Sequence, residues 1–175
     1  MAERAPEVPE IAATDFADLV RRHQAMVFSI ALHFLGDYGA AEELAQDVFV
    51  QLHNNLSGFE SEAHITFWLR KVTAHRCIDR KRRRRPFHLS IEDAPEPSVS
   101  TRSSDPFLER RLRQFVASLP QKPRLVMILR YKEDMRLEDI AEVLSMLVAT
   151  VKSHLQRSLA ILREKLTRTI GEVKL

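Results

Sequence analysis

Residues 137–157 read LEDIAEVLSMLVATVKSHLQR. Two apolar patterns decide the fold: one lies inside this stretch, and the other begins in it and continues to Leu166. The first pattern consists of Leu137, Ile140, Ala141 and Leu144, and the second of Val151, Leu155, Leu159, Leu162 and Leu166. Both recur at the spacing of one face of an α-helix. The break between the two predicted helices consists of three residues, Ser145, Met146 and Leu147. Two helices joined by so short a turn predict a helix-turn-helix.

The second of these helices carries polar residues opposite its apolar face. They are Thr150, Lys152, Ser153, His154, Gln156 and Arg157. A helix that lies in the major groove of DNA needs such hydrogen-bonding side chains near its N-terminal end. A solvated face on an ordinary helical bundle carries the same residue types, so the pattern alone leaves both interpretations open.

The preceding segment predicts two more helices. Asp105 followed by Pro106 is typical of a helix start, because Asp caps free amides and Pro fits the first helical position. An apolar stripe then follows, formed by Leu108, Leu112, Phe115, Val116 and Leu119. Pro120 ends this helix, and Pro123 begins a short one that stops at the turn Glu133-Asp134. We therefore expect a helical domain over residues 105–170.

The N-terminal half predicts a second small helical domain over residues 12–85. Its first helix runs from a Thr14 cap to Gly36, and a turn at residues 37–39 leads to a second helix that ends at Ser57-Gly58. After a loop at 59–64, a third helix continues into the arginines before Pro86. Its apolar stripe consists of Ile65, Trp68, Leu69 and Val72, so Trp68 is expected in the core.

Residues 86–104 contain Pro, Ser and acidic residues with no apolar period, which indicates a flexible linker. Stretched out, about 19 residues reach several tens of ångströms, so the two domains could sit apart. The fold class expected is thus all-α, with two small helical domains joined by a linker. Helix formers are plentiful and only four glycines occur in the 175 residues, which agrees with that class.

Composition argues against several functional classes. The single cysteine, Cys77, is interpreted as a small semi-buried side chain, and the seven histidines never cluster with it at metal-ligand spacing. We therefore predict no catalytic residues, no cofactor and no metal. No apolar run reaches membrane-spanning length, and the acidic N-terminus with two prolines is unlike a signal peptide. A cytoplasmic protein is expected.

Charge is very unevenly distributed along the chain. Between Asp37 and Glu62 there is no Lys or Arg, whereas between Arg70 and Arg85 nine basic residues are opposed only by Asp79. The first stretch repels DNA and suits a basic protein surface, and the second attracts phosphate.

Several motifs together resemble one known family. Leu119-Pro120, Arg130-Tyr131, Glu138-Asp139-Ile140-Ala141 and residues 148–153 (VATVKS) are similar to domain four of extracytoplasmic-function sigma factors of bacterial RNA polymerase. Residues 42–49 (EELAQDVF), Phe67-Trp68-Leu69 and Asp79 with the following arginines resemble domain two of the same family. The resemblance covers about residues 15–166, with both domains in order.

The resemblance implies a non-enzymatic transcription initiation factor. Its partners would be core RNA polymerase (the clamp of the largest subunit and the flap of the second), promoter DNA and an anti-sigma factor. It implies polymerase binding by Glu42, Glu43, Gln46, Asp47 and Phe49. It implies minus-ten recognition and melting by Phe59, His64, Lys71, His75, Arg76, Asp79 and Arg80, and minus-thirty-five recognition by the six polar residues between Thr150 and Arg157.

Four residues depart from the family pattern. Ser145 stands where Gly is usual in a turn that needs a positive φ, and Leu147 stands where Ser commonly caps the recognition helix. His75 replaces an Asn of the base pocket, and His154 replaces a frequent Arg on the recognition helix. We therefore expect a C-terminal domain of low stability and altered base preference at both promoter elements.

Two other functions fit parts of the pattern. A conventional helix-turn-helix activator would bind an operator as a dimer without being a polymerase subunit. A nucleic-acid-processing enzyme would use the scattered His and Asp residues, but the sequence has no metal triad, nucleophile elbow or phosphate loop.

Overall fold

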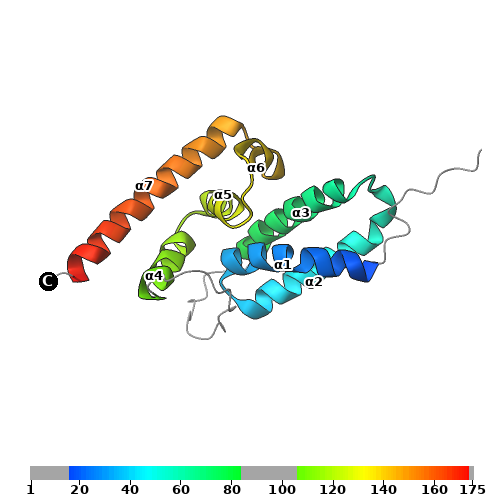
Figure 1. The fold of residues 1–175 in the computed structure, drawn as a ribbon, viewed down its shortest axis with the longest axis horizontal. Helices are drawn as coiled ribbons and strands as arrows, with labels where there is room; N and C mark the ends of the chain where they lie inside the picture. The colour runs from blue at the N-terminus through cyan, green and yellow to red at the C-terminus, as the bar shows by residue number, and fades with distance from the viewer. Residues whose placement is uncertain (1–15, 84–105, 174–175) are drawn as a thin grey trace, which may run out of the picture.

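The computed structural model describes residues 16–83 and 106–173, and within them every regular element is helical. The N-terminal domain consists of α1 (Phe16–Leu35), α2 (Tyr38–Asn54), a 3-10 turn (Leu56–Gly58) and α3 (Glu62–Arg83). The C-terminal domain consists of α4 (Pro106–Ala117), α5 (Gln121–Tyr131), α6 (Leu137–Val143) and α7 (Val148–Val173). The all-α prediction is confirmed (Figure 1). The expected Thr14 and Asp105 caps and the linker lie outside the described residues.

The break between α1 and α2 is shorter than predicted. Gly36 ends α1 with a φ of +71°, a conformation that costs little only for glycine. Asp37 then caps α2 directly, because its Oδ1 accepts a 2.6 Å hydrogen bond from the Ala40 amide. Tyr38 and Gly39, predicted as part of a turn, are therefore the first residues of α2.

The start of α3 also differs from the prediction. The loop ends at Ser61, whose Oγ accepts a 3.2 Å hydrogen bond from the His64 amide, so α3 begins at Glu62 and His64 lies in its first turn. Farther along, Ile65 and Leu69 are fully buried, and Trp68 packs partly buried against the same core. The predicted core role of Trp68 is confirmed.

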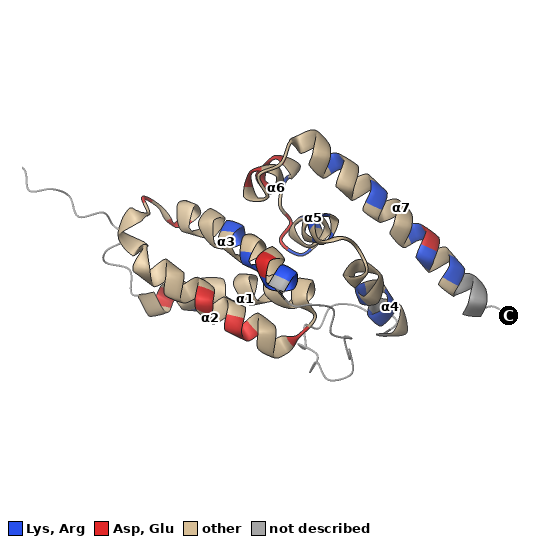
Figure 2. Ribbon diagram, turned by 180° about the vertical axis from the view of Figure 1, so that it is seen from behind, with Lys and Arg blue, Asp and Glu red and all other residues tan. Residues whose placement is uncertain are grey.

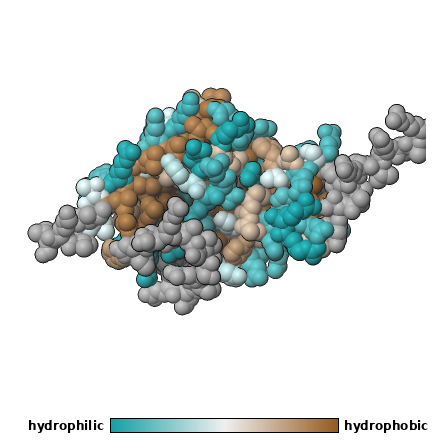
Figure 3. Space-filling model, in the orientation of Figure 1, coloured by the Kyte–Doolittle hydropathy of each residue, from teal (hydrophilic) through white to brown (hydrophobic). Residues whose placement is uncertain are grey.

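The predicted stripe of α4 is only half covered. Leu108 and Leu112 remain 39% and 40% exposed, whereas Phe115 and Val116 pack against Leu119 and the buried Leu162 of α7. Apolar residues gather on the half of the molecule that holds α4 and α7 (Figure 3). The C-terminal domain therefore keeps an apolar surface that its own helices do not bury.

Helix α5 joins the two domains into one packed body. It begins at Gln121, two residues earlier than predicted, since Pro123 is tolerated in a first turn. Six consecutive residues, Arg124 to Leu129, are buried, and a helix buried on all sides needs partners on more than one face. It packs on α6 and α7 on one side and on α1 on the other (Figure 1). The linker length allowed separate domains, but in this structure they share one apolar core.

Candidate nucleic-acid interface

The basic helix α3 has one face next to α6 and another next to α2. His64, Trp68, Lys71 and His75 follow the four-three-four spacing of one helix face. On this face His64 and His75 are exposed and Lys71 is half-buried. The predicted minus-ten residues His64, Lys71 and His75 therefore share one side of α3.

The other predicted basic residues of α3 face the acidic helix α2. Arg80 pairs with Glu43, and Arg76 lies 3.7 Å from the Asp47 carboxylate and donates two hydrogen bonds to the Gln51 side chain, at 2.8 and 3.1 Å. The acidic stretch and the basic stretch of the sequence are thus neighbours in space (Figure 2). To bind a DNA phosphate, Arg76 or Arg80 would have to leave its carboxylate partner on α2 or bind both groups at once.

Two predicted contact residues are buried in the N-terminal core instead. Phe49 is 9% exposed and Phe59 is 5% exposed, and both belong to the core cluster. The Phe59 ring packs edge-on against two neighbours, with its centroid 5.2 Å from that of His64 and 5.3 Å from that of Trp68. Neither phenylalanine is available to a partner in this conformation. The contact roles predicted for these two residues therefore stay predictions that need a conformation in which the rings are more exposed.

The other residues of the predicted polymerase-binding surface are on the outside of α2. Glu42, Glu43, Gln46 and Asp47 are all exposed. Glu43 pairs with Arg80, and Asp47 pairs with Arg76. Glu42 and Gln46 are the residues that directly precede Glu43 and Asp47 in the helix. The exposed face of α2 is therefore acidic, with its charge partly balanced at the α3 edge.

Polar contacts also cross between the two domains. His75 Nε2 lies 3.2 Å from the Val143 carbonyl at the end of α6. Glu133, before α6, has a pKa raised by burial and lowered less strongly by the positive charge of Arg70 on α3. The C-terminal domain therefore lies against the same side of α3 that carries the predicted base-pocket residue His75.

Arg124 is a buried charged residue of α5 at this domain boundary. It is 3% exposed, its Nη1 donates a 2.9 Å hydrogen bond to the Phe34 carbonyl, and its guanidinium carbon lies 5.5 Å from the Phe34 ring centroid. Burial lowers its pKa from the usual value. Sequence analysis missed this residue, because it stands at the polar edge of the apolar run 125–129, close to Lys122, where an exposed charge is equally expected.

The polar face predicted for the recognition helix is on the outside of α7. Thr150, Lys152, Gln156 and Arg157 are exposed, and Ser153 and His154 are half-buried. The pKa of His154 is lowered by burial and then by the nearby charges of Arg157 and Lys122. Lys122, in the first turn of α5, is a second residue that sequence analysis did not select.

The turn before α7 contains a backbone conformation that is unfavourable for the residue that adopts it. Ser145 has a φ of +52°, as expected from a position where the family uses glycine. Leu147 precedes α7 and its side chain is 76% exposed, while its backbone carbonyl accepts from Thr150 and Val151 at 2.9 and 3.1 Å. A leucine side chain has no acceptor for the first-turn amides, so Leu147 gives this helix start no side-chain cap.

The Cys77 thiol is fully buried, more than the semi-buried position predicted, and burial raises its pKa to about 12. Within residues 16–83 and 106–173, no group of three or more His, Cys, Asp or Glu side chains could hold a metal ion. In the same residues no helix is long and apolar enough to cross a membrane.

This arrangement, a basic helix in one domain and a helix-turn-helix in the other, is typical of a two-domain helical DNA-binding protein. Comparison with family models agrees with both halves: residues 19–87 match sigma-70 region 2, and residues 109–162 match sigma-70 region 4. Among curated proteins, the chain is 28% identical to the ECF RNA polymerase sigma factor SigW of Bacillus subtilis, over 86% of this chain and 88% of that protein. It is 30% identical to an RNA polymerase sigma-E factor of Streptomyces avermitilis, over 87% and 85%.

The chain therefore belongs to the extracytoplasmic-function sigma factors of RNA polymerase. Two solved structures share its fold. One is the sigma factor RpoE of Bartonella quintana in complex with the anti-sigma factor NepR, with a TM-score of 0.71, 20% identity, and 87% of this chain and 97% of that chain covered. The other is CnrH in complex with the cytosolic domain of CnrY, with a TM-score of 0.68, 22% identity, and 90% and 92% covered.

Proposed function

We propose that the exposed acidic face of α2 docks this sigma factor on core RNA polymerase, while α3 and α7 read the minus-ten and minus-thirty-five elements. The observation that carries the proposal is the charge division of one small domain. Its α2 presents Glu42, Glu43, Gln46 and Asp47, while the adjacent α3 is basic. An acidic surface suits a basic protein partner and a basic surface suits DNA.

The partner surfaces on polymerase follow from the family resemblance together with the exposed chemistry. The acidic α2 face would meet the clamp of the largest subunit. The exposed Leu108 and Leu112 of α4 would meet the flap of the second subunit, because an unburied apolar patch of this kind suits a protein contact. On α7, Thr150, Lys152 and Gln156 would contact base edges.

Domain packing supports a requirement for polymerase before DNA is read. His75 is hydrogen-bonded to Val143, and α6 lies along α3, so the minus-ten face is partly covered. We propose that core polymerase separates the domains and uncovers this face. In this scheme Phe59 packs on His64 and so keeps His64 in position in the base pocket. Phe59 does not itself stack on a base.

The remaining parts of the proposal concern regulation and location. The two similar solved structures are both of complexes with a second protein, which is named as an anti-sigma factor in one of them. We propose that an anti-sigma factor likewise holds this chain inactive in the cytoplasm. The protein would act by binding and would not be an enzyme.

Run-off transcription with purified core polymerase tests the proposal. The template is a duplex selected from random DNA by the holoenzyme, and a promoter-specific transcript that depends on this protein is expected. Glu42→Lys should weaken binding to core polymerase, whereas the charge-matched Glu164→Lys on the far part of α7 should not. Absence of a specific transcript from wild-type protein refutes the proposal. Specific footprints without polymerase would instead favour an operator-binding activator.

A further inference from the structure

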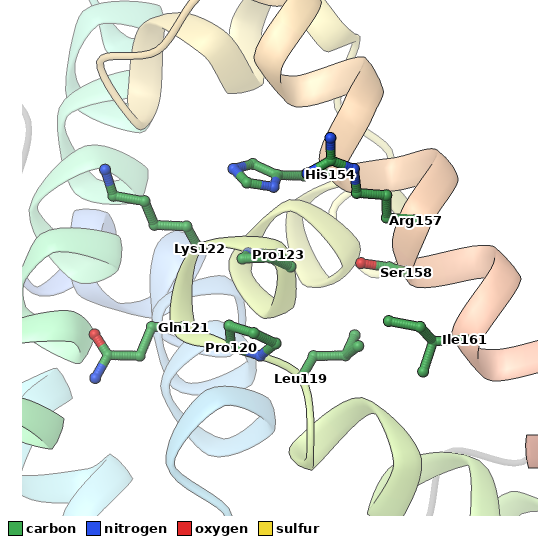
Figure 4. Close-up of a pocket in the computed structure, with 9 residues that line it drawn as sticks. All are labelled: Leu119, Pro120, Gln121, Lys122, Pro123, His154, Arg157, Ser158 and Ile161. Carbon is green, nitrogen blue, oxygen red and sulfur yellow. The ribbon is translucent and has the colours of Figure 1, made fainter.

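A cavity lies beside the DNA-reading helix, between α7 and the start of α5. It has a volume of about 570 Å³. It is lined by Leu119, Pro120, Gln121, Lys122, Pro123, His154, Arg157, Ser158 and Ile161 (Figure 4). Apolar side chains form much of its wall, and polar ones come from α7 and the first turn of α5. The cavity therefore offers both an apolar surface and a polar one to a ligand.

Its charged lining is basic. Lys122, His154 and Arg157 line the cavity, and none of the nine lining residues is acidic. Burial lowers the pKa of His154, and the nearby positive charges of Arg157 and Lys122 lower it further, so the positive charge of the lining comes from Lys122 and Arg157. Such a cluster attracts an anion.

The start of α5 adds backbone donors. Pro120 occupies the N-cap position and makes no side-chain cap hydrogen bond. Amides in the first turn of a helix have no partner inside the helix, and the helix dipole places partial positive charge there. The Gln121 and Lys122 amides lie in this turn, so the eleven-residue helix α5 presents an uncapped N-terminus beside the basic side chains.

Ser158 gives an independent indication of a ligand. The residue is 1% exposed, and its Oγ has no hydrogen-bond partner within the described part of the chain. Its oxygen points from α7 toward Pro123 and the cavity (Figure 4). A buried hydroxyl without a partner is costly, and a ligand oxygen in the cavity would supply the missing bond.

We propose that this cavity holds one backbone phosphate of the promoter duplex, next to the bases that α7 reads. Lys122 and the α5 amides would bind the phosphate oxygens, Ser158 would donate to one of them, and the sugar would pack on Pro120, Pro123 and Ile161. This inference rests on the proposed function, because it requires α7 to lie on DNA. DNA is favoured over an acidic peptide, since His154 and Arg157 belong to both the cavity and the polar face of α7.

The first test uses holoenzyme and a duplex that carries the selected minus-thirty-five element. Lys122→Gln should reduce the slope of log affinity against log salt by about 0.9, equivalent to roughly a threefold smaller loss of affinity between 50 and 200 mM salt. Arg168→Gln removes the same charge from an exposed pair with Glu164 and is the matched control. Replacing single phosphates by neutral methylphosphonates should weaken wild-type binding at one phosphate where the Lys122→Gln holoenzyme is insensitive.

The second test uses Ser158→Ala. It distinguishes a serine that binds a phosphate from one that has only a structural role. Removing an unpartnered buried hydroxyl should raise the melting temperature of the free protein, yet lower holoenzyme affinity for the duplex by about three- to tenfold. Unchanged DNA affinity in Ser158→Ala overturns the role of the hydroxyl as a phosphate ligand.

Two further outcomes distinguish failure of the phosphate site from failure of the proposed function, and a phosphate site from a protein-binding cavity. If Lys122→Gln leaves the salt slope and every methylphosphonate effect unchanged, the phosphate site is wrong while promoter-specific transcription by wild-type protein still supports the proposed function. If the same variant weakens binding to core polymerase in the absence of DNA, the cavity takes a protein segment and the inference is overturned.

Discussion

Arg124 should control how firmly the two domains pack. The residue is 3% exposed, and its guanidinium donates to the Phe34 carbonyl at 2.9 Å and lies 5.5 Å from the centroid of the Phe34 ring. Arg124→Met keeps most of the side-chain volume and removes the charge and the hydrogen bond. Arg124→Ala removes the packing as well. The pair of variants therefore separates polar from apolar contributions at this boundary.

The magnitudes follow from these contacts. A hydrogen bond from a charged donor contributes about 1.5–3 kcal/mol and a desolvated cation–ring contact about 1–2 kcal/mol. Relief of guanidinium desolvation offsets part of this sum. We expect Arg124→Met to lower the free energy of unfolding by about 2 kcal/mol. Arg124→Ala should lower it by about 3–4 kcal/mol, because it also leaves a cavity.

Urea unfolding of the full chain measures stability, and energy transfer between dyes measures domain separation. Cysteines placed at the exposed Gln46 and Arg163 accept the dyes, while the buried Cys77 should not react. Arg124→Met should reduce transfer under native conditions. A cost below about 0.5 kcal/mol for Arg124→Met, with unchanged transfer, would refute the view that this contact holds the domains together.

Three other predictions concern stability and reactivity. Ser145→Gly combined with Leu147→Ser should relieve the positive φ and cap α7, raising the melting temperature by roughly 4–8 °C for a gain of about 2 kcal/mol; Ser145→Ala alone, as control, should give no gain. Cys77, with a pKa raised to about 12, should resist a thiol reagent at pH 8 until urea unfolds the chain, and rapid native labelling would contradict its burial. The unfolding free energy should fall as pH drops below 6.5, because burial lowers the pKa of His23 and the unfolded chain therefore binds the proton more readily. Urea midpoints at pH 7.5 and 5.5 measure this fall. His23→Asn should reduce the difference between the two midpoints.

Local features of the fold were predictable because they depend on residues close in sequence. Helix periods and the Gly36 stop follow from side-chain spacing and from the steric limits on φ. The positive φ of Ser145 was expected only from the resemblance to a family that uses glycine at this position. The exposed polar face of α7 follows from the same spacing. Errors of a few residues occurred at Tyr38 and Gln121, where a side-chain cap or a tolerated proline decides where a helix begins.

Residue roles were harder to predict, since a side chain's exposure depends on distant partners. Phe49 and Phe59 looked like contact residues within polar motifs, but both fill the N-terminal core. Arg76 and Arg80 looked free to bind phosphate, but α2 brings carboxylates to them. A one-dimensional charge pattern does not show which oppositely charged stretches will become neighbours.

The sequence by itself determined that this sigma factor is two sets of amphipathic helices, with a turn before α7 that favours glycine. Only the tertiary structure decided that the sets pack together, with Arg124 on Phe34 and His75 on Val143. It also decided that Lys122, His154 and Ser158 line one cavity. The physical reason is that helix formation depends on neighbours three or four residues away, whereas these contacts join helices far apart in the chain.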